Sequence, residues 1–231
     1  MGVHDFQGKT VFVTGAAQDQ GRAVAWAFAR AGAKLSLFDT RAHAVELELL
    51  AWSLRAEHCH VQYFLGDVRN EANVSWAVEK TVKSSGGIDV LFNSTGISTP
   101  GQCWEITEEA WDMVLDVNLK GAWIVAKWVA PEMVLRKSGL ILNYPTEPET
   151  CEGGSSVHYA ASRWGVAGLT KALASELAPF GVRAISLHSE GELRSPRDVA
   201  EAALFLAGPF GQAWEGTDFE IEPGFLARES F

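Results

Sequence analysis

The stretch KTVFVTGAAQDQGRAVAWAFARAGA, residues 9–33, decides the fold of this chain. It opens as a short apolar run rich in β-branched residues, which is typical of a buried strand, and it closes with helical periodicity. Between the two lies TGAAQDQG, a turn with glycine at Gly15 and Gly21. Such turns hold a dinucleotide's pyrophosphate on glycines and on backbone N–H groups of the following helix. The middle of this turn, however, carries Asp19, a carboxylate where a phosphate is expected.

Asp19 allows three interpretations. Its side chain could cap the helix that begins at about Gln20, since a carboxylate is favourable at a helix N-terminus. It could bend away from a bound diphosphate, or it could occupy the anion site in place of the phosphate. Because a buried contact between a carboxylate and a diphosphate is strongly unfavourable, we expect a helix cap together with weak or absent cofactor binding.

Strand-like and helix-like segments alternate along the whole chain. We expect strands at residues 10–14, 34–39, 61–65, 88–93, 139–144, 182–188 and 217–221. We expect helices at about residues 21–31, 42–57, 70–85, 107–136, 157–179 and 196–207. This alternation predicts an α/β, Rossmann-type, doubly wound parallel sheet of about seven strands with helices on both faces. We expect one domain over residues 1–231.

Composition excludes several classes of partner. The 231 residues carry a formal net charge of −10, which argues against nucleic-acid binding and against docking on anionic lipid. No apolar run reaches membrane-spanning length, and no signal peptide is visible. The three cysteines include no CxxC pair, so we expect reduced thiols in a cytoplasmic protein. The run His58-Cys59-His60 lacks further ligands nearby, so we expect no metal.

An acidic residue ends the second expected strand. Asp39 follows Gly21 by 18 residues. A carboxylate at this position typically binds the adenosine ribose hydroxyls and repels a 2′-phosphate. It therefore favours NAD over NADP, although a turn aspartate is the plainer alternative.

Further stretches resemble the short-chain dehydrogenase/reductase family over residues 8–224. They are GDVRN at 66–70, LFNSTGI at 91–97, DVNLKGAW at 116–123 and YAASR at 159–163. The family has Asn-Asn-Ala-Gly where this chain has NSTG. The resemblance implies a catalytic tyrosine at Tyr159 and a helix asparagine at Asn118. It implies a cofactor site formed by Gly15, Asp19, Gly21, Asp39, Asp67, Val68, Asn93 and Gly96.

The chain also departs from the family pattern. Arg163 replaces the family's lysine, and Thr146 stands where the family keeps a catalytic serine. The Pro-Gly turn after the sixth strand is replaced by Ser189-Glu190. Almost nothing remains between Glu190 and Ser195, where the family has a substrate-covering lid. We therefore expect a shortened lid.

The departures bear on the chemistry. An unperturbed tyrosine is a poor base at neutral pH, and Arg163, one helical turn after Tyr159, supplies a charge that would lower its pKa. A guanidinium is wider than the ammonium that the family uses to bind the nicotinamide ribose, so this exchange is not conservative. Thr146 would hold a substrate oxygen, and Asn118 would anchor a water.

Three functions remain open. We favour a non-redox enzyme of the cyclase, lyase or isomerase type, in which Tyr159 transfers a proton on a small oxygenated molecule with NAD(H) absent or weakly bound. The second is an NAD-dependent oxidoreductase acting on a carbonyl or alcohol. The third is an inactive protein that binds a metabolite or partner.

The resemblance also implies assembly. In the family, the helices corresponding to about 107–136 and 157–179 pair across a two-fold axis, which predicts a homodimer or homotetramer. Four tryptophans in or near the first of these are expected in the core and in subunit contacts: Trp104, Trp111, Trp123 and Trp128.

Overall fold

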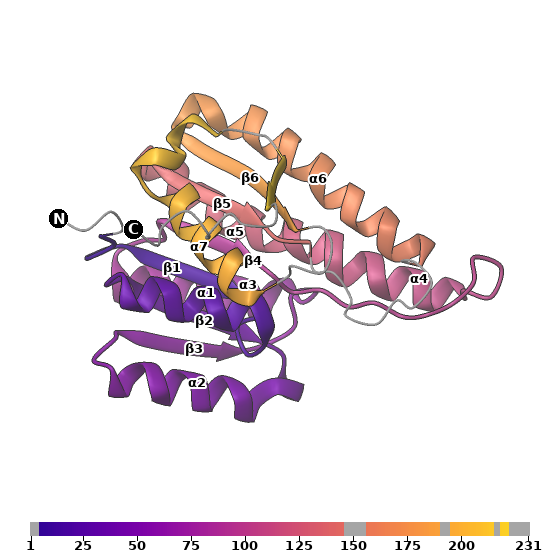
Figure 1. Cartoon of the computed structure of the whole chain (residues 1–231), viewed down its shortest axis with the longest axis horizontal. Coiled ribbons are helices and arrows are strands. Elements are labelled where there is room, and N and C mark those ends of the chain that lie inside the picture. Colours follow the sequence, from indigo (N-terminus) through magenta and orange to yellow (C-terminus); the bar gives the residue numbers. More distant parts are fainter. Residues whose placement is uncertain (1–4, 146–155, 190–194, 215–217, 222–231) are drawn as a thin grey trace.

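The computed structural model describes residues 5–145, 156–189, 195–214 and 218–221. Within these residues, seven parallel strands form one sheet in the order β3-β2-β1-β4-β5-β6-β7 (Figure 1). The strands are β1 (Thr10–Thr14), β2 (Lys34–Asp39), β3 (Val61–Leu65), β4 (Val90–Asn93), β5 (Gly139–Asn143), β6 (Val182–Ser189) and β7 (Asp218–Ile221). The predicted doubly wound α/β fold is confirmed.

Helices connect the strands. They are α1 (Asp19–Arg30), α2 (Ala44–Ala56), α3 (Glu71–Ser85), α4 (Glu108–Leu115), α5 (Gly121–Arg136), α6 (Val157–Leu177) and α7 (Pro196–Ala207). The helix expected at 107–136 is in fact α4 and α5 joined by a π-helical turn over Asp116–Lys120. None of the helices in the described residues is long and apolar enough to cross a membrane.

The helices cover both faces of the sheet, which explains the uninterrupted apolar run of β1. Val11 and Val13 belong to a cluster of buried side chains that includes residues of α1, α2 and α7. Phe12, between them, belongs to a second cluster that includes residues of α3, α5 and α6. Successive side chains of a strand point to opposite faces, so each face of β1 is buried under its own helical layer.

The strand order reverses between β1 and β4. From β1 the chain adds β2 and β3 on one side, and from β4 it adds β5, β6 and β7 on the other. In open α/β sheets the crevice at the carboxyl ends of the strands around such a reversal is where ligands bind. Most of the residues predicted for the site lie at or just after these ends.

Candidate active site

The turn after β1 has a shape that only glycine permits at two positions. Gly15 has φ +63°, and a Cβ there would lie 2.8 Å from the carbonyl oxygen of Ser94. A Cβ on Gly21 would overlap the carbonyl oxygen of Gly15. Both obstacles are backbone atoms, which cannot move aside as a flexible side chain can. The turn therefore keeps the tight cradle of backbone N–H groups that a diphosphate needs at the N-terminus of α1.

Asp19 does not cap α1, so that prediction is wrong. Gln18 has the extended backbone of an N-cap residue, with φ −135° and ψ 161°, whereas Asp19 is the first helical residue and has φ +43°. Its side chain is exposed and accepts no hydrogen bond from the residues that the structure describes. Asp19 therefore takes the positive φ of a glycine, which aspartate tolerates better than most residues, and it leaves the anion site open.

Asp39 lies at the end of β2 and is 5% exposed. One carboxylate oxygen accepts a hydrogen bond from the backbone N–H of Ala17 at 2.8 Å. The other accepts from the N–H of Thr40 at 2.7 Å and from Nδ1 of His43 at 2.9 Å. The carboxylate predicted to bind a ribose thus also holds the phosphate turn against the end of β2.

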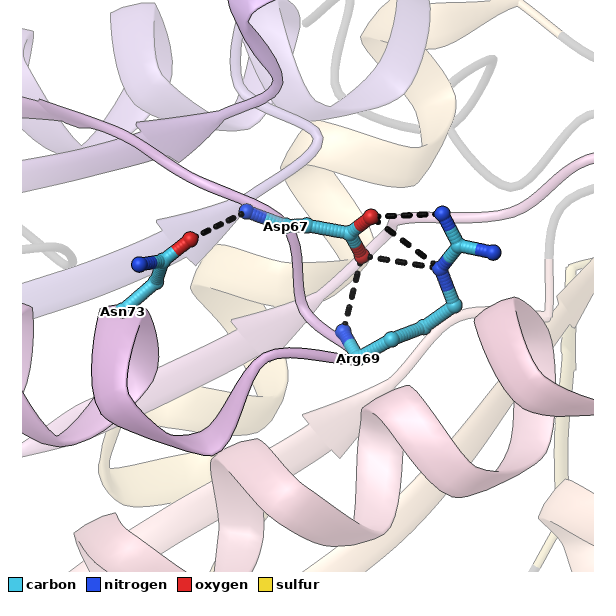
Figure 2. Close-up of polar contacts among 3 residues, drawn as sticks. All are labelled: Asp67, Arg69 and Asn73. Atoms are coloured by element: carbon cyan, nitrogen blue, oxygen red, sulfur yellow. Dashed lines mark hydrogen bonds and ion pairs between the residues drawn. The ribbon is translucent and has the colours of Figure 1, made fainter.

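The loop after β3 presents a second carboxylate (Figure 2). The N–H of Asp67 donates to Oδ1 of Asn73 at 3.2 Å, and its carboxylate accepts hydrogen bonds from Arg69, the shortest at 2.6 Å. The hydrogen bonds from the Arg69 side chain lower the pKa of Asp67. The neighbouring Val68 is buried against the start of α5, where a Cβ on Gly121 would lie 2.7 Å from its side chain. Asp67 and Val68 border the adenine-contacting position that the resemblance implies.

Asn93 has a structural role. Its side-chain Nδ2 donates to Oδ1 of Asn143 at 2.9 Å, and Nδ2 of Asn143 donates to Oγ1 of Thr170 at 2.9 Å. The Thr14 hydroxyl lies 3.5 Å from Oδ1 of Asn93. These contacts link the ends of β1, β4 and β5 to α6. Gly96 lies in the loop that follows Asn93 and is partly exposed.

Asn118 lies in the π-helical turn and fixes the same loop. Its Oδ1 accepts from the N–H of Ile97 at 2.8 Å, and its Nδ2 donates to the carbonyl of Ile97 at 3.0 Å and to Oγ of Ser162 at 2.9 Å. The Ser162 hydroxyl in turn donates to the carbonyl oxygen of Tyr159 at 2.7 Å. Asn118 therefore connects the loop after β4 to the turn of α6 that carries Tyr159.

Tyr159 and Arg163 lie one turn apart on α6. Tyr159 is 1% exposed, and Arg163 is half-buried. Arg163 lines a small cavity at the carboxyl ends of β1, β4 and β5. That cavity is lined by Thr14, Val68, Asn93, Thr95, Asn118, Gly121, Ala122, Asn143, Tyr144, Pro145, Ser162, Arg163 and Val166.

His158, which precedes Tyr159, is fully buried beside the site. Its Nε2 lies 2.7 Å from Oγ1 of Thr99, and its ring stacks on Trp111 with centroids 6.3 Å apart. Burial lowers the pKa of His158, which favours the neutral ring. These contacts fix the start of α6 against α4 and the loop before it.

Two predicted features lie wholly or partly outside the described residues. Thr146 is one of them, so its place relative to Tyr159 stays a prediction. The other is the shortened lid, of which the structure describes the two ends: β6 ends at Ser189 and α7 begins at Pro196. Residues 190–195 connect them, and the shortened lid stays a prediction.

Three polar residues near the site had no role in the sequence analysis: Thr95, Asn143 and Ser162. Asn143 ends an apolar strand just as Asn93 does, and this shared position was a signal of a paired role. Ser162 lies three residues after Tyr159, on a neighbouring part of the helix surface. Thr95 stands where the family has alanine, and this departure was the one signal that the sequence offered for it.

Comparisons with known proteins identify the family. The short chain dehydrogenase family model matches residues 9–191, so the chain belongs to that family. It is 38% identical over 204 residues to an oxidoreductase, UcpA, of Salmonella typhimurium, covering 87% of this chain and 75% of the relative. It is 30% identical over 246 residues to D-threitol dehydrogenase of Mycolicibacterium smegmatis, covering 96% of this chain and 94% of the relative. A dehydrogenase/reductase structure from Sinorhizobium meliloti superposes with a TM-score of 0.84 at 26% identity, covering 94% of each chain.

These relatives correct two expectations. They are named as oxidoreductases and dehydrogenases, and a 3-oxoacyl-[acyl-carrier-protein] reductase of Thermotoga maritima is 30% identical. The favoured non-redox reaction is therefore wrong, and so is the expectation that NAD(H) is absent or weakly bound. The physical reason lies in Asp19, whose exposed carboxylate does not fill the anion site.

Proposed function

We propose that this chain is an NAD-dependent oxidoreductase that interconverts an alcohol and a carbonyl compound. One observation carries the proposal: the buried Asp39 carboxylate accepts the Ala17 N–H of a glycine turn that would hold a diphosphate. The end of β2 and the turn after β1 thus adjoin one another, and they would bind the adenosine and the diphosphate portions of a dinucleotide. The family match and the names of the relatives support the same reaction class.

The residues present fit a dinucleotide. The turn between Gly15 and Gly21 would bind its diphosphate. Asp39 would bind its adenosine ribose, and Asp67 and Val68 would contact its adenine. When bound, the nicotinamide supplies or accepts the hydride. Asp39 makes NAD the preferred form, because a 2′-phosphate would approach a buried carboxylate.

Side chains of this protein would transfer the proton that accompanies the hydride. We assign Tyr159 as the general acid or base, with Arg163 one helical turn away supplying a positive charge that stabilises the phenolate. Asn118 and Ser162 act through Tyr159, because together they bind the backbone on which it stands. We assign Thr146 to bind the substrate oxygen, as the resemblance implies.

The short connection between β6 and α7 points to an open substrate pocket. The alignment with D-threitol dehydrogenase spans 246 positions while covering 96% of this 231-residue chain, so the relative carries segments that have no counterpart here. A site with little covering structure is either open to solvent or completed by a second subunit.

Assembly and location complete the proposal. We infer a homodimer or homotetramer that pairs through helices near 107–136 and 157–179. On these helices Trp123 is 44% exposed and Trp164 is 75% exposed, which would leave large apolar groups in water on a monomer. A cytoplasmic location is consistent with the free thiols of Cys59 and Cys103.

A matched pair of tyrosine variants tests the function. The change in NADH absorbance is followed for a panel of small alcohols and carbonyl compounds. Tyr159→Phe should abolish turnover while NADH still binds. Tyr63→Phe removes a hydroxyl that bonds Glu48 at the surface and should leave turnover unchanged. Full activity of Tyr159→Phe would refute the assignment.

A further inference from the structure

The cavity at the carboxyl ends of β1, β4 and β5 is small, and both polar and apolar side chains line it. Its volume is about 20 Å³, enough for one water-sized group. Most of its polar side chains already have partners. Asn93 and Asn143 bond one another, and Asn118 bonds both Ile97 and Ser162.

Thr95 differs from these neighbours. Its hydroxyl oxygen is buried and has no hydrogen-bond partner among the residues that the structure describes. A buried hydroxyl without a partner lowers stability, and a valine of nearly the same shape would avoid that penalty. Ser156 and His158 also contain buried polar atoms without such partners, but neither residue lines this cavity. The unsatisfied group of Thr95 is thus placed on the wall of a cavity that can receive a ligand atom.

The position of the cavity along the sheet indicates which part of a dinucleotide would lie beside it. Asp39 ends β2 and would hold the adenosine side of a dinucleotide. Dinucleotides lie across the strand reversal, so the nicotinamide side extends toward β4 and β5. Thr95 follows β4 on that side, and Arg163, from α6, lines the same cavity.

We propose that Thr95 is a positioning residue whose hydroxyl binds a ribose hydroxyl on the nicotinamide side of the nucleotide. This inference rests on the proposed function. The hydrogen-bonding groups of Arg163 and Thr95, which both line the cavity, complement a ribose hydroxyl. A guanidinium only donates hydrogen bonds, so the ribose oxygen accepts from Arg163, while the hydroxyl of Thr95 can accept the ribose proton.

Calorimetric titration with three nucleotides tests the proposal. ADP-ribose contains the second ribose but no nicotinamide, and ADP lacks that ribose. Thr95→Val should weaken the binding of NADH and of ADP-ribose about three- to tenfold, the range of one lost neutral hydrogen bond, and should leave ADP unchanged. Thr95→Ser keeps the hydroxyl and should bind all three within about twofold of the wild type.

Thermal unfolding separates positioning from a structural role. Without nucleotide, Thr95→Val should melt at the wild-type temperature or above it, because a buried unsatisfied hydroxyl is removed. Thr81→Val is the control, since its hydroxyl bonds Ser36 and the carbonyl of Ala77 far from the cavity. It should lower stability and leave nucleotide affinity unchanged.

Two results overturn this inference and leave the proposed function standing. The first is wild-type affinity of Thr95→Val for ADP-ribose, which would mean that the hydroxyl meets only water or substrate. The second is an equal loss of ADP and ADP-ribose affinity, which would mean that Thr95 only shapes the loop. If the wild-type protein binds none of the three nucleotides, the proposed function fails and this inference fails with it.

Discussion

The carboxylate of Asp39 lies 2.8 Å from the backbone N–H of Ala17, so the residue that would select the cofactor also shapes the turn that would bind its diphosphate. The two elements involved, the end of β2 and the turn after β1, are neighbours in the sheet. Stability and cofactor choice are therefore coupled at one side chain. A change at Asp39 should therefore affect both stability and cofactor choice.

Asp39→Asn tests this coupling. An amide offers one acceptor oxygen where the carboxylate offers two, so one of the N–H groups of Ala17 and Thr40 loses its partner. We expect a loss of about 1–3 kcal/mol in the free energy of unfolding, measured by urea titration. The preference for NADH over NADPH should shrink in the same variant. Asp112→Asn, at an exposed position on α4, is the control and should change neither quantity.

Removal of the Asp19 charge should tighten cofactor binding further. Two unit charges 4 Å apart in water interact by about 1 kcal/mol, which is about fivefold in affinity. Asp19→Asn removes the charge and tolerates the same positive φ, so it should bind NADH several-fold more tightly at low salt. The gain should diminish as salt rises, because exposed charges are screened. Equal affinities of the two proteins at low salt would show that the carboxylate points away from the nucleotide.

Asn118→Ala should loosen the loop after β4. The variant leaves the N–H and carbonyl of Ile97 without their partner, at a cost of about 1–3 kcal/mol in the free energy of unfolding. Because Asn118 also bonds Ser162 beside Tyr159, kcat should fall more than nucleotide affinity. Asn70→Ala removes the cap of α3 and should cost about 1 kcal/mol while leaving kcat unchanged. Similar kcat values for the two variants would contradict the positioning role.

His158 should make stability depend on pH. Burial lowers the pKa of its ring in the folded protein, so the unfolded chain binds a proton more readily. Stability is therefore greatest above the unfolded value of about 6.5 and falls as pH drops from there through the lowered folded pKa. The pKa of Asp89 is also lowered in the folded protein, so its protonation reduces stability only at more acidic pH.

A glutamine at position 158 removes the titrating ring. Urea unfolding of His158→Gln between pH 7 and 5 should show a flatter dependence on pH than the wild type. His60→Gln, at an exposed position, should follow the wild-type curve. Parallel curves for all three proteins would show that His158 does not titrate in this range.

The sequence was most informative where apolar runs are bounded by polar residues or glycine. The bounds of β1, β2 and β3 agree with the predicted ones, because each is a buried strand with clear limits. The division of residues 107–136 was missed, since a π-helical turn continues the same apolar periodicity and leaves no sequence signal. Trp104, Trp111 and Trp123 are 78%, 41% and 44% exposed, so they do not lie in the core of the chain, and the subunit contacts expected for them stay a prediction.

The site was harder to predict, because its polar groups act through the folded backbone. Asp19 suited both a helix cap and a left-handed turn, and only the structure shows φ +43°. The bonds from Asn118 to the Ile97 backbone join residues 21 positions apart, which no local pattern reveals. The reaction class was predicted wrongly because Asp19 and Arg163 depart visibly from the family pattern, whereas the sequence does not show that the turn between Gly15 and Gly21 keeps its backbone cradle.

Calorimetric titration of the purified chain with NADH tests the central claim most directly. The account predicts saturable binding, tighter for NADH than for NADPH, and a rise in melting temperature as NADH is added. No detectable binding at nucleotide concentrations up to about 1 mM, which corresponds to a binding free energy weaker than about −4 kcal/mol, would contradict it.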